Sequence, residues 1–257
     1  MNRLSRGMIG AMALLACQAY AQDTIRFGVE ATYPPFESKQ ADGKLVGFDI
    51  DLGNAICTQL KAHCVWVENS FDGMIPALKA KKFDGIISSM SITTERLKQI
   101  SFSDKLFNTP AFLAVKKGSQ LKATPEALRG KRVGVQQGSI FETYAKKYWA
   151  PRGVTVTTYQ SSDLAYADLV SGRLDGVIDD AVVLRDAFLS KPNGQGYEMA
   201  GPEIYDAAIF GHGTGIGLRK EDIALRQKLN SAIAAIHRNG TYDKLAKKYF
   251  SFNVYGK

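Results

Sequence analysis

The sequence predicts an α/β protein with two lobes, each built on a mainly parallel sheet flanked by helices. After residue 22, the spacing of the apolar residues switches repeatedly between 2 and about 3.6, which is typical of strands that alternate with helices. Two motifs also recur in the same order: Arg-x-Gly-Val at 26–29 and 132–135, and an Asp-Gly strand in "KKFDGIISS" (81–89) and "SGRLDGVIDD" (171–180). Chance similarity between two βαβ units would explain either recurrence alone, so the two together favour a repeated lobe.

The first half of the chain is predicted to contain three strands and two helices. The strands lie at 24–29, 64–68 and 83–89, and a short helix lies at 71–82 with Met74, Ile75 and Leu78 inward. A longer helix follows "VGF" at 46–48, where Asp49 is a candidate N-cap. Its inward face carries Ile50, Gly53, Cys57 and Leu60.

The second half repeats this plan and then returns to the first lobe. A strand opens at 132, a helix covers 162–173, and the chain crosses between lobes at 105–115 and 204–218. After the second crossing, a helix over 221–240 ends at Asn239-Gly240 and has Leu225, Leu229, Ile233 and Ile236 inward. We therefore expect one lobe at 22–108 and 213–257, the other at 112–204, and a hinge at 109–111 and 205–212.

The N-terminal segment has the layout of a secretory signal peptide. Arg3 and Arg6 precede the apolar run "MIGAMALLAC", and the small-residue site Ala19-Tyr20-Ala21 follows. The run is too short for a stable membrane span, which needs about 20 apolar residues. We expect residues 1–21 to be removed and the mature protein to be exported and soluble. An alternative, lipidation of Cys17 after "LLA", is disfavoured because Leu15 is bulky for such a site.

Removal of the signal peptide leaves two cysteines, Cys57 and Cys64, and an even count in an exported protein indicates one disulfide. In a continuous helix their Cα atoms would lie about 10.5 Å apart, too far for a bridge, so the helix must end before Cys64. Two free thiols are the less favoured alternative. A metal site is poorer still, because only His63 lies nearby and no CxxC pair is present.

The net charge does not indicate a nucleic-acid-binding protein. The full chain carries +8, and loss of the two signal-peptide arginines leaves +6. The lysines are spread along the sequence, with one dense cluster in "KLAKKYF" near the C-terminus. Solvated helix faces explain this distribution better than a nucleic-acid surface does.

Polar side chains follow strands in both predicted lobes. Parallel βα units bind ligands at the carboxyl ends of their strands. Residues at these ends would face one another across a cleft: Glu30, Ser88 and Ser89 from the first lobe, and Gln136, Asp179 and Asp180 from the second. The two similar motifs then end differently because they hold different ends of one small polar molecule.

Arg96 is the candidate anion-binding residue. It follows three serines and two threonines in "SSMSITTERLKQISFS" (88–103), and its guanidinium can donate two parallel hydrogen bonds to a carboxylate. The alternative is that Thr93 and Thr94 cap a helix while Arg96 pairs with Glu95 at the surface, and composition alone does not decide between the two. Tyr33 and Phe71 similarly suit either a core or a cleft wall.

Seven segments together resemble one protein family across residues 22–257. They are "TYPPFE", "LVGFDIDLGNAIC", "IPALKAKKFDGIISSMSITTER", "ISFSDKLFNTP", "VGVQQGS", "GRLDGVIDD" and "NGTYDKLAKKYFSFNVYG". They are similar to the polar amino-acid family of periplasmic solute-binding proteins (family 3), most of all to the lysine/arginine/ornithine- and histidine-binding group of ABC importers. The resemblance implies the type II periplasmic-binding-protein fold and closure of a hinge around a cationic L-amino acid.

The resemblance also implies a role for each matching residue. Tyr33 and Phe71 would sandwich the ligand's aliphatic chain, and Cys57 and Cys64 match the group's disulfide. Glu30 and Ser88 would meet the distal cation. The α-carboxylate would be held by Arg96, Ser91 and the backbone around Ser139, and the α-ammonium by Asp180 and the Ser89 region. Related proteins usually have Asp at position 30 and other residues at Gln136, Ile140 and Phe141, which leaves the preferred ligand open, including an arginine-derived opine.

Other functions on the same fold are less favoured. Some dehydratases of aromatic amino-acid precursors resemble this family, but only His212 of the three histidines could approach the cleft, although acidic residues could still serve. A receptor or lytic-enzyme module would carry a membrane segment or further domain, and the sequence ends at Lys257. We therefore expect a free-standing, monomeric binding protein with no enzymatic activity, metal or cofactor, which delivers its ligand to a membrane permease.

Overall fold

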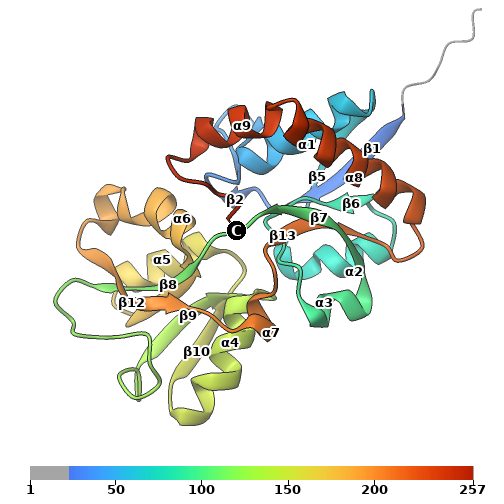
Figure 1. The fold of residues 1–257 in the computed structure, drawn as a ribbon. Coiled ribbons are helices and arrows are strands. Elements are labelled where there is room, and N and C mark those ends of the chain that lie inside the picture. Colours follow the sequence, from blue (N-terminus) through green and yellow to red (C-terminus); the bar gives the residue numbers. More distant parts are fainter. Residues whose placement is uncertain (1–22, 257) are drawn as a thin grey trace, which may run out of the picture.

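The computed structural model describes residues 23–256, so the predicted signal peptide and Cys17 lie outside the described residues. Two five-stranded mixed sheets, each flanked by helices, lie next to each other and are joined by extended segments (Figure 1). The predicted α/β class with two lobes is confirmed. Between residues 23 and 256, no helix is long and apolar enough to cross a membrane.

The first sheet has the strand order β5-β1-β6-β13-β7. β1 (Thr24–Val29) pairs in parallel with β5 (His63–Glu68) and β6 (Gly85–Ile86), and β13 (Thr214–Leu218) runs antiparallel to β6 and to β7 (Ser101–Phe107). A small sheet of β2 (Thr32–Tyr33), β3 (Glu37–Lys39) and β4 (Leu45–Val46) lies beside it. The helices of this part are α1 (Phe48–Gln59), η1 (Phe71–Gly73), α2 (Met74–Lys79), α3 (Thr94–Gln99), α8 (Ile223–Arg238) and α9 (Thr241–Tyr249).

The second sheet has the same plan, with the order β10-β9-β11-β8-β12. β9 (Arg132–Gln136) pairs in parallel with β10 (Thr155–Tyr159) and β11 (Gly176–Asp180), while β8 (Ala111–Lys116) is antiparallel to β11 and β12 (Tyr197–Ile204). The helices here are α4 (Ile140–Tyr148), η2 (Ala150–Arg152), α5 (Ser162–Val170), α6 (Ala181–Val183), the π-helical η3 (Leu184–Leu189), η4 (Pro192–Gly194) and α7 (Ala207–Phe210).

The recurring motifs have the same structural role in both sheets. The Arg26 side chain and backbone N–H both donate to Asp84 of the first Asp-Gly motif, at 3.0 Å each. Arg132 makes the same two contacts with Asp175, at 3.2 and 2.8 Å. Arg26 is the third residue of β1 and Arg132 is the first of β9, and in each case the aspartate directly precedes the third parallel strand. The repeated sequence thus fixes how these two strands lie side by side.

The glycine of each Arg-x-Gly-Val motif allows a close approach between elements. A Cβ atom on Gly28 would lie 2.6 Å from the Phe83 ring, and one on Gly134 would lie 2.5 Å from Leu174. Phe83 and Leu174 both come directly before an Asp-Gly motif, so this contact is duplicated too. A side chain at either glycine would displace a buried apolar residue.

The chain passes from the first sheet to the second between Phe107 and Ala111 and returns between Ile204 and Thr214 (Figure 1). The C-terminal segment lies at the first crossing, where the Asn108 N–H donates to the Val254 carbonyl at 2.9 Å. The bounds given above for the lobes and the hinge stay a prediction.

Two predictions about α1 have different outcomes. The helix ends at Gln59, which brings the Cα atoms of Cys57 and Cys64 to 5.9 Å, and the predicted disulfide forms. The assignment of Asp49 as N-cap was wrong, because Gly47 occupies the cap position without a side-chain hydrogen bond. Asp49 lies inside the first turn, is only 1 % exposed, and accepts the Ser89 N–H at 2.7 Å. Its carboxylate therefore binds another segment instead of its own helix.

Gly28→Ala should destabilise the protein, because the new methyl would lie 2.6 Å from a Phe83 ring that is fully buried. Overpacking of this kind costs about 1–3 kcal/mol. Urea unfolding of the variant would measure the loss. Gly196→Ala is the matched control: a Cβ there meets nothing within 4 Å, so its free energy of unfolding should change by less than about 0.5 kcal/mol. Equal stability of both variants would contradict the proposed close approach.

Candidate functional site

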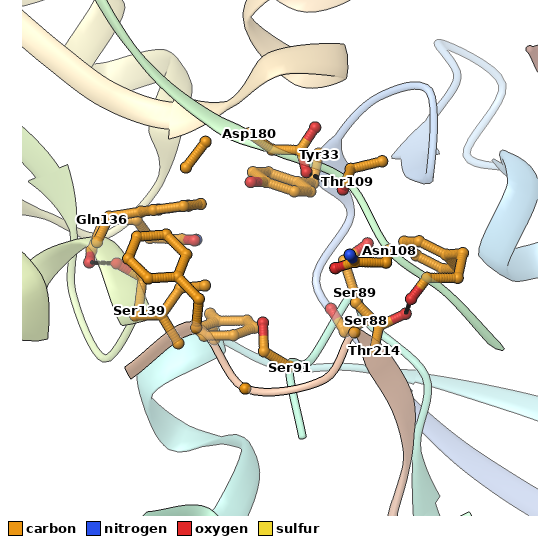
Figure 2. A pocket seen from close by; sticks show the side chains of 18 of the residues that line it. Tyr33, Ser88, Ser89, Ser91, Asn108, Thr109, Gln136, Ser139, Asp180 and Thr214 are labelled. Atoms are coloured by element: carbon orange, nitrogen blue, oxygen red, sulfur yellow. Dashed lines mark hydrogen bonds between the residues drawn. The ribbon is translucent and has the colours of Figure 1, made fainter. Parts of the chain in front are cut away.

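The carboxyl ends of strands from both sheets converge on one pocket. Glu30 follows β1, Ser88 and Ser89 follow β6, Gln136 ends β9 and Asp180 ends β11. Figure 2 shows Tyr33, Ser88, Ser89 and Ser91 of the first part around the same space as Gln136, Ser139 and Asp180 of the second. All eleven residues predicted to bind ligand line this pocket: Glu30, Tyr33, Phe71, Ser88, Ser89, Ser91, Arg96, Gln136, Ser139, Ile140 and Asp180. The group that each of them binds stays a prediction.

Arg96 carries the positive charge of the pocket wall. Thr93 caps α3 by accepting the Arg96 N–H, so this part of the helix-cap alternative is confirmed. The predicted surface pair of Arg96 with Glu95 does not form, because Arg96 lines the pocket and Glu95 pairs with Lys98. The Arg96 guanidinium donates to the Ser91 carbonyl at 3.0 Å and to the Gly138 carbonyl at 3.1 Å. Arg96 is 8 % exposed, and burial lowers its pKa to about 10. None of the acidic side chains at 23–256 forms an ion pair with it.

The surroundings of the guanidinium favour an anion at this end of the pocket. The Phe71 ring lies 5.4 Å from the Arg96 carbon Cζ, in a cation–π contact. Ser139 is the N-cap of α4, so the positive end of this helix faces the same space. A carboxylate placed here would meet a full positive charge and a helix N-terminus together.

Glu30 is a buried acid of the pocket wall. Its Oε1 accepts the Thr32 hydroxyl at 3.1 Å, and its Oε2 accepts the Gln136 side-chain amide at 2.6 Å. Both donors are neutral, and burial raises the pKa of Glu30 to about 7. The bond to Gln136 joins the first sheet to the second across the pocket. A cation within reach of Glu30 would favour its charged form.

Asp180 and Asp179 end the same strand but serve different purposes. Asp180 lines the pocket, caps α6 through the N–H groups of Val182 and Val183, and accepts a short hydrogen bond from Thr109. Burial raises its pKa to about 7. Asp179 was predicted to face the cleft, but it lies outside the pocket lining. It accepts the Tyr33 hydroxyl across the two sheets at 2.5 Å and the Tyr166 hydroxyl at 2.6 Å.

Several lining residues were missed by sequence reasoning. Most of them come from the two crossings, which were read as connections and not as walls. Glu37 had no signal at all, because its partners are distant in sequence. The missed residues are Glu37, Phe107, Asn108, Thr109, Ala111, Glu203, Tyr205, Phe210, Gly211, Gly213 and Thr214.

The histidines do not lie in the pocket. Gly211 and Gly213 line it while His212 between them is exposed to solvent. His237 stacks on Tyr242 with 4.0 Å between ring centroids, and His63 is exposed at the start of β5. Among residues 23–256, no cluster of three His, Cys, Asp or Glu side chains could hold a metal ion. Within the described part of the chain, the pocket lining therefore contains no histidine that could act as a general acid or base.

Comparisons with known proteins agree with this geometry. The chain is 47% identical to the lysine/arginine/ornithine-binding periplasmic protein of Escherichia coli strain K12. The alignment spans 249 residues and covers 97% of this chain and 96% of the relative. The chain is 49% identical over 241 residues to the histidine-binding periplasmic protein of the same strain, with 94% and 93% covered. An ancestral arginine-binding protein solved with arginine superposes with a TM-score of 0.83 at 40% identity, covering 90% of this chain and 99% of that one.

The family model of the bacterial extracellular solute-binding proteins, family 3, matches residues 25–252. With the duplicated sheets, the pocket between them and relatives near 50% identity over almost the whole length, this match establishes the family. The chain belongs to the bacterial extracellular solute-binding proteins, family 3.

Proposed function

We propose that this chain is a periplasmic binding protein that captures a cationic L-amino acid, such as arginine, lysine, ornithine or histidine, and delivers it to the permease of an ABC importer. Periplasmic relatives named for lysine, arginine and ornithine or for histidine support both the location and the ligand class. The observation that carries the proposal is the charge pattern of the pocket. Among residues 23–256, Arg96 is the one buried cation of its lining, and two of its buried acids, Glu30 and Asp180, have only neutral hydrogen-bond donors.

A cationic amino acid complements this pattern group by group. Its α-carboxylate would bind Arg96, Ser91 and the start of α4, and its α-ammonium would bind Asp180 and Ser89. Its distal cation would reach Glu30 and Ser88, with the aliphatic chain between Tyr33 and Phe71. Burial of any of these charges without a partner costs several kcal/mol. A neutral amino acid would leave Glu30 unmatched, so the pocket favours a ligand with two positive groups.

A calorimetric screen of the twenty amino acids, ornithine and octopine tests the ligand class. Arginine, lysine, ornithine or histidine should bind at least about 100-fold more tightly than any neutral or acidic amino acid, because only a cation satisfies Glu30. Tighter binding of octopine would assign the site to opines. A preference for a neutral amino acid would contradict the charge-matching argument.

Glu30→Gln should weaken the binding of arginine about 10²–10³-fold and leave the weak binding of citrulline nearly unchanged. The loss corresponds to about 3–5 kcal/mol for one unmatched member of a buried pair. Asp180→Asn should weaken both ligands alike, since every amino acid carries the α-ammonium, and Asn can still cap α6. Calorimetry at one pH measures both variants.

Glu203→Gln is the matched control, because Glu203 lines the pocket but is exposed, and we expect less than about a threefold change. If Glu30→Gln reduced the affinities for arginine and citrulline by the same factor, Glu30 would support the pocket without reading the ligand's charge.

Addition of arginine should decrease the radius of gyration measured by small-angle scattering. In the closed arrangement Arg96, Glu30 and Asp180 are buried, and without a ligand their charges are better solvated in an open cleft. The ligand supplies the missing partners and favours closure. A profile that does not change at saturating arginine would indicate a pocket that is rigid on this scale.

A further inference from the structure

Two acidic side chains meet behind the serine wall of the pocket without a basic partner. Glu37 begins β3 and Asp49 lies in the first turn of α1, and each is 1 % exposed. Both contact Ser89: its hydroxyl lies 3.1 Å from Oε2 of Glu37 and 3.3 Å from Oδ2 of Asp49. Among the eleven ion pairs of residues 23–256, none includes Glu37 or Asp49. Glu37 also lines the pocket.

Two adjacent buried carboxyl groups cannot both ionise in such a place, so they share one proton. Burial, and then the negative charge of Asp49, raises the pKa of Glu37 well above its usual value, and burial raises the pKa of Asp49 to about 7. The Ser89 N–H donates to Asp49 at 2.7 Å, which stabilises charge on that residue. The proton therefore resides on Glu37, and the pair carries its single negative charge on Asp49.

This arrangement fixes the hydrogen-bond polarity of the two serines. A hydroxyl has one hydrogen to donate and two lone pairs to accept with. Ser88 donates its hydrogen to Oε1 of Glu37 at 3.0 Å and accepts the Glu30 N–H at 3.0 Å. Ser89 donates its hydrogen to the acid pair. Both hydroxyls therefore present only lone pairs to the pocket, where they lie on the same side (Figure 2).

We propose that Glu37 is a positioning residue for ligand charge: by accepting the hydroxyl hydrogens of Ser88 and Ser89, it makes this wall of the pocket accept hydrogen bonds only. Such a wall favours ammonium and guanidinium groups, which only donate, and disfavours carbonyl and carboxylate groups, which only accept. The inference rests on the proposed binding of a cationic amino acid and assigns to its specificity a residue that does not itself bind the charge.

The test compares Glu37→Met with Glu37→Gln by calorimetry with arginine and citrulline. Methionine accepts no hydrogen bond of comparable strength, so the hydroxyl of Ser88 is free to turn its hydrogen toward the distal group of the ligand. Arginine should then weaken about 10–100-fold, and the arginine-to-citrulline affinity ratio should fall about tenfold, because the citrulline carbonyl can accept the freed hydrogen. Neither variant replaces Asp49, but only glutamine keeps a hydrogen-bond donor for its carboxylate.

Glutamine reproduces the neutral form of Glu37, with a carbonyl oxygen for Ser88 and an N–H for Asp49. Glu37→Gln should therefore keep the affinity ratio within about threefold of the wild type. A ratio as low as that of Glu37→Met would overturn the assignment of the proton to Glu37. If Glu37→Met lowered the affinities for both ligands by one factor, its role would be structural only and the proposal would fall.

Ser88→Ala provides an independent check that does not depend on the folding of Glu37→Met. If Glu37 acts through this hydroxyl, Ser88→Ala alone should lower the arginine-to-citrulline ratio, and Glu37→Met should lower it no further in that background. An unchanged ratio in Ser88→Ala would overturn the mechanism. Failure of the proposed function itself is separately visible, because the wild-type protein would then not bind arginine.

Discussion

The pocket depends on one constraint: charged groups are buried in it without protein partners of opposite charge. Arg96 donates to two carbonyl oxygens, one from each part of the chain, while Glu30 and Asp180 accept hydrogen bonds from neutral donors. Each of these charges would cost several kcal/mol in a dry, closed pocket. In the closure that we propose, the ligand brings the counter-charges that make this burial favourable.

The residues that hold the strands of each sheet together are different from the residues that line the pocket. In both sheets an arginine of the first parallel strand holds the aspartate before the third, and a glycine lets an apolar side chain approach the first strand. These repeated contacts give the same strand arrangement twice. The residues that follow the repeated part differ: Ser88 and Ser89 follow one strand and Asp180 ends the other, so one framework presents two different polar surfaces to the same pocket.

The sequence predicted the features that depend on local pattern or on strand ends. The strands and the repeated lobes could be predicted from local patterns, and Glu30, Ser88, Ser89, Gln136 and Asp180 could be placed at a cleft because strand ends meet in such sheets. Arg96 was indicated by its hydroxyl-rich segment, and the other pocket residues were assigned from the family resemblance. Asp49 was misread as a helix cap because an acid in a first turn looks the same whether it serves its own helix or binds Ser89 of another segment. Glu37 could not be found at all, since its contacts with residues 49, 88 and 89 exist only after folding.

Over the described residues, hydrogen bonds, and not ion pairs, join the two parts of the chain across the pocket. Gln136 donates to Glu30, Tyr33 to Asp179 and Gln137 to Asp72, and each of these bonds joins a neutral donor to an acid. The Arg96 guanidinium donates to the neutral carbonyl of Gly138. Among ion pairs with both partners in residues 23–256, none connects 111–204 with the rest of the chain. Neutral-to-charged hydrogen bonds contribute about 1.5–3 kcal/mol each, less than the 3–5 kcal/mol lost when a buried ion pair is broken. In the closure that we propose, such bonds would align the two parts, and the charges of the ligand would supply the larger stabilisation.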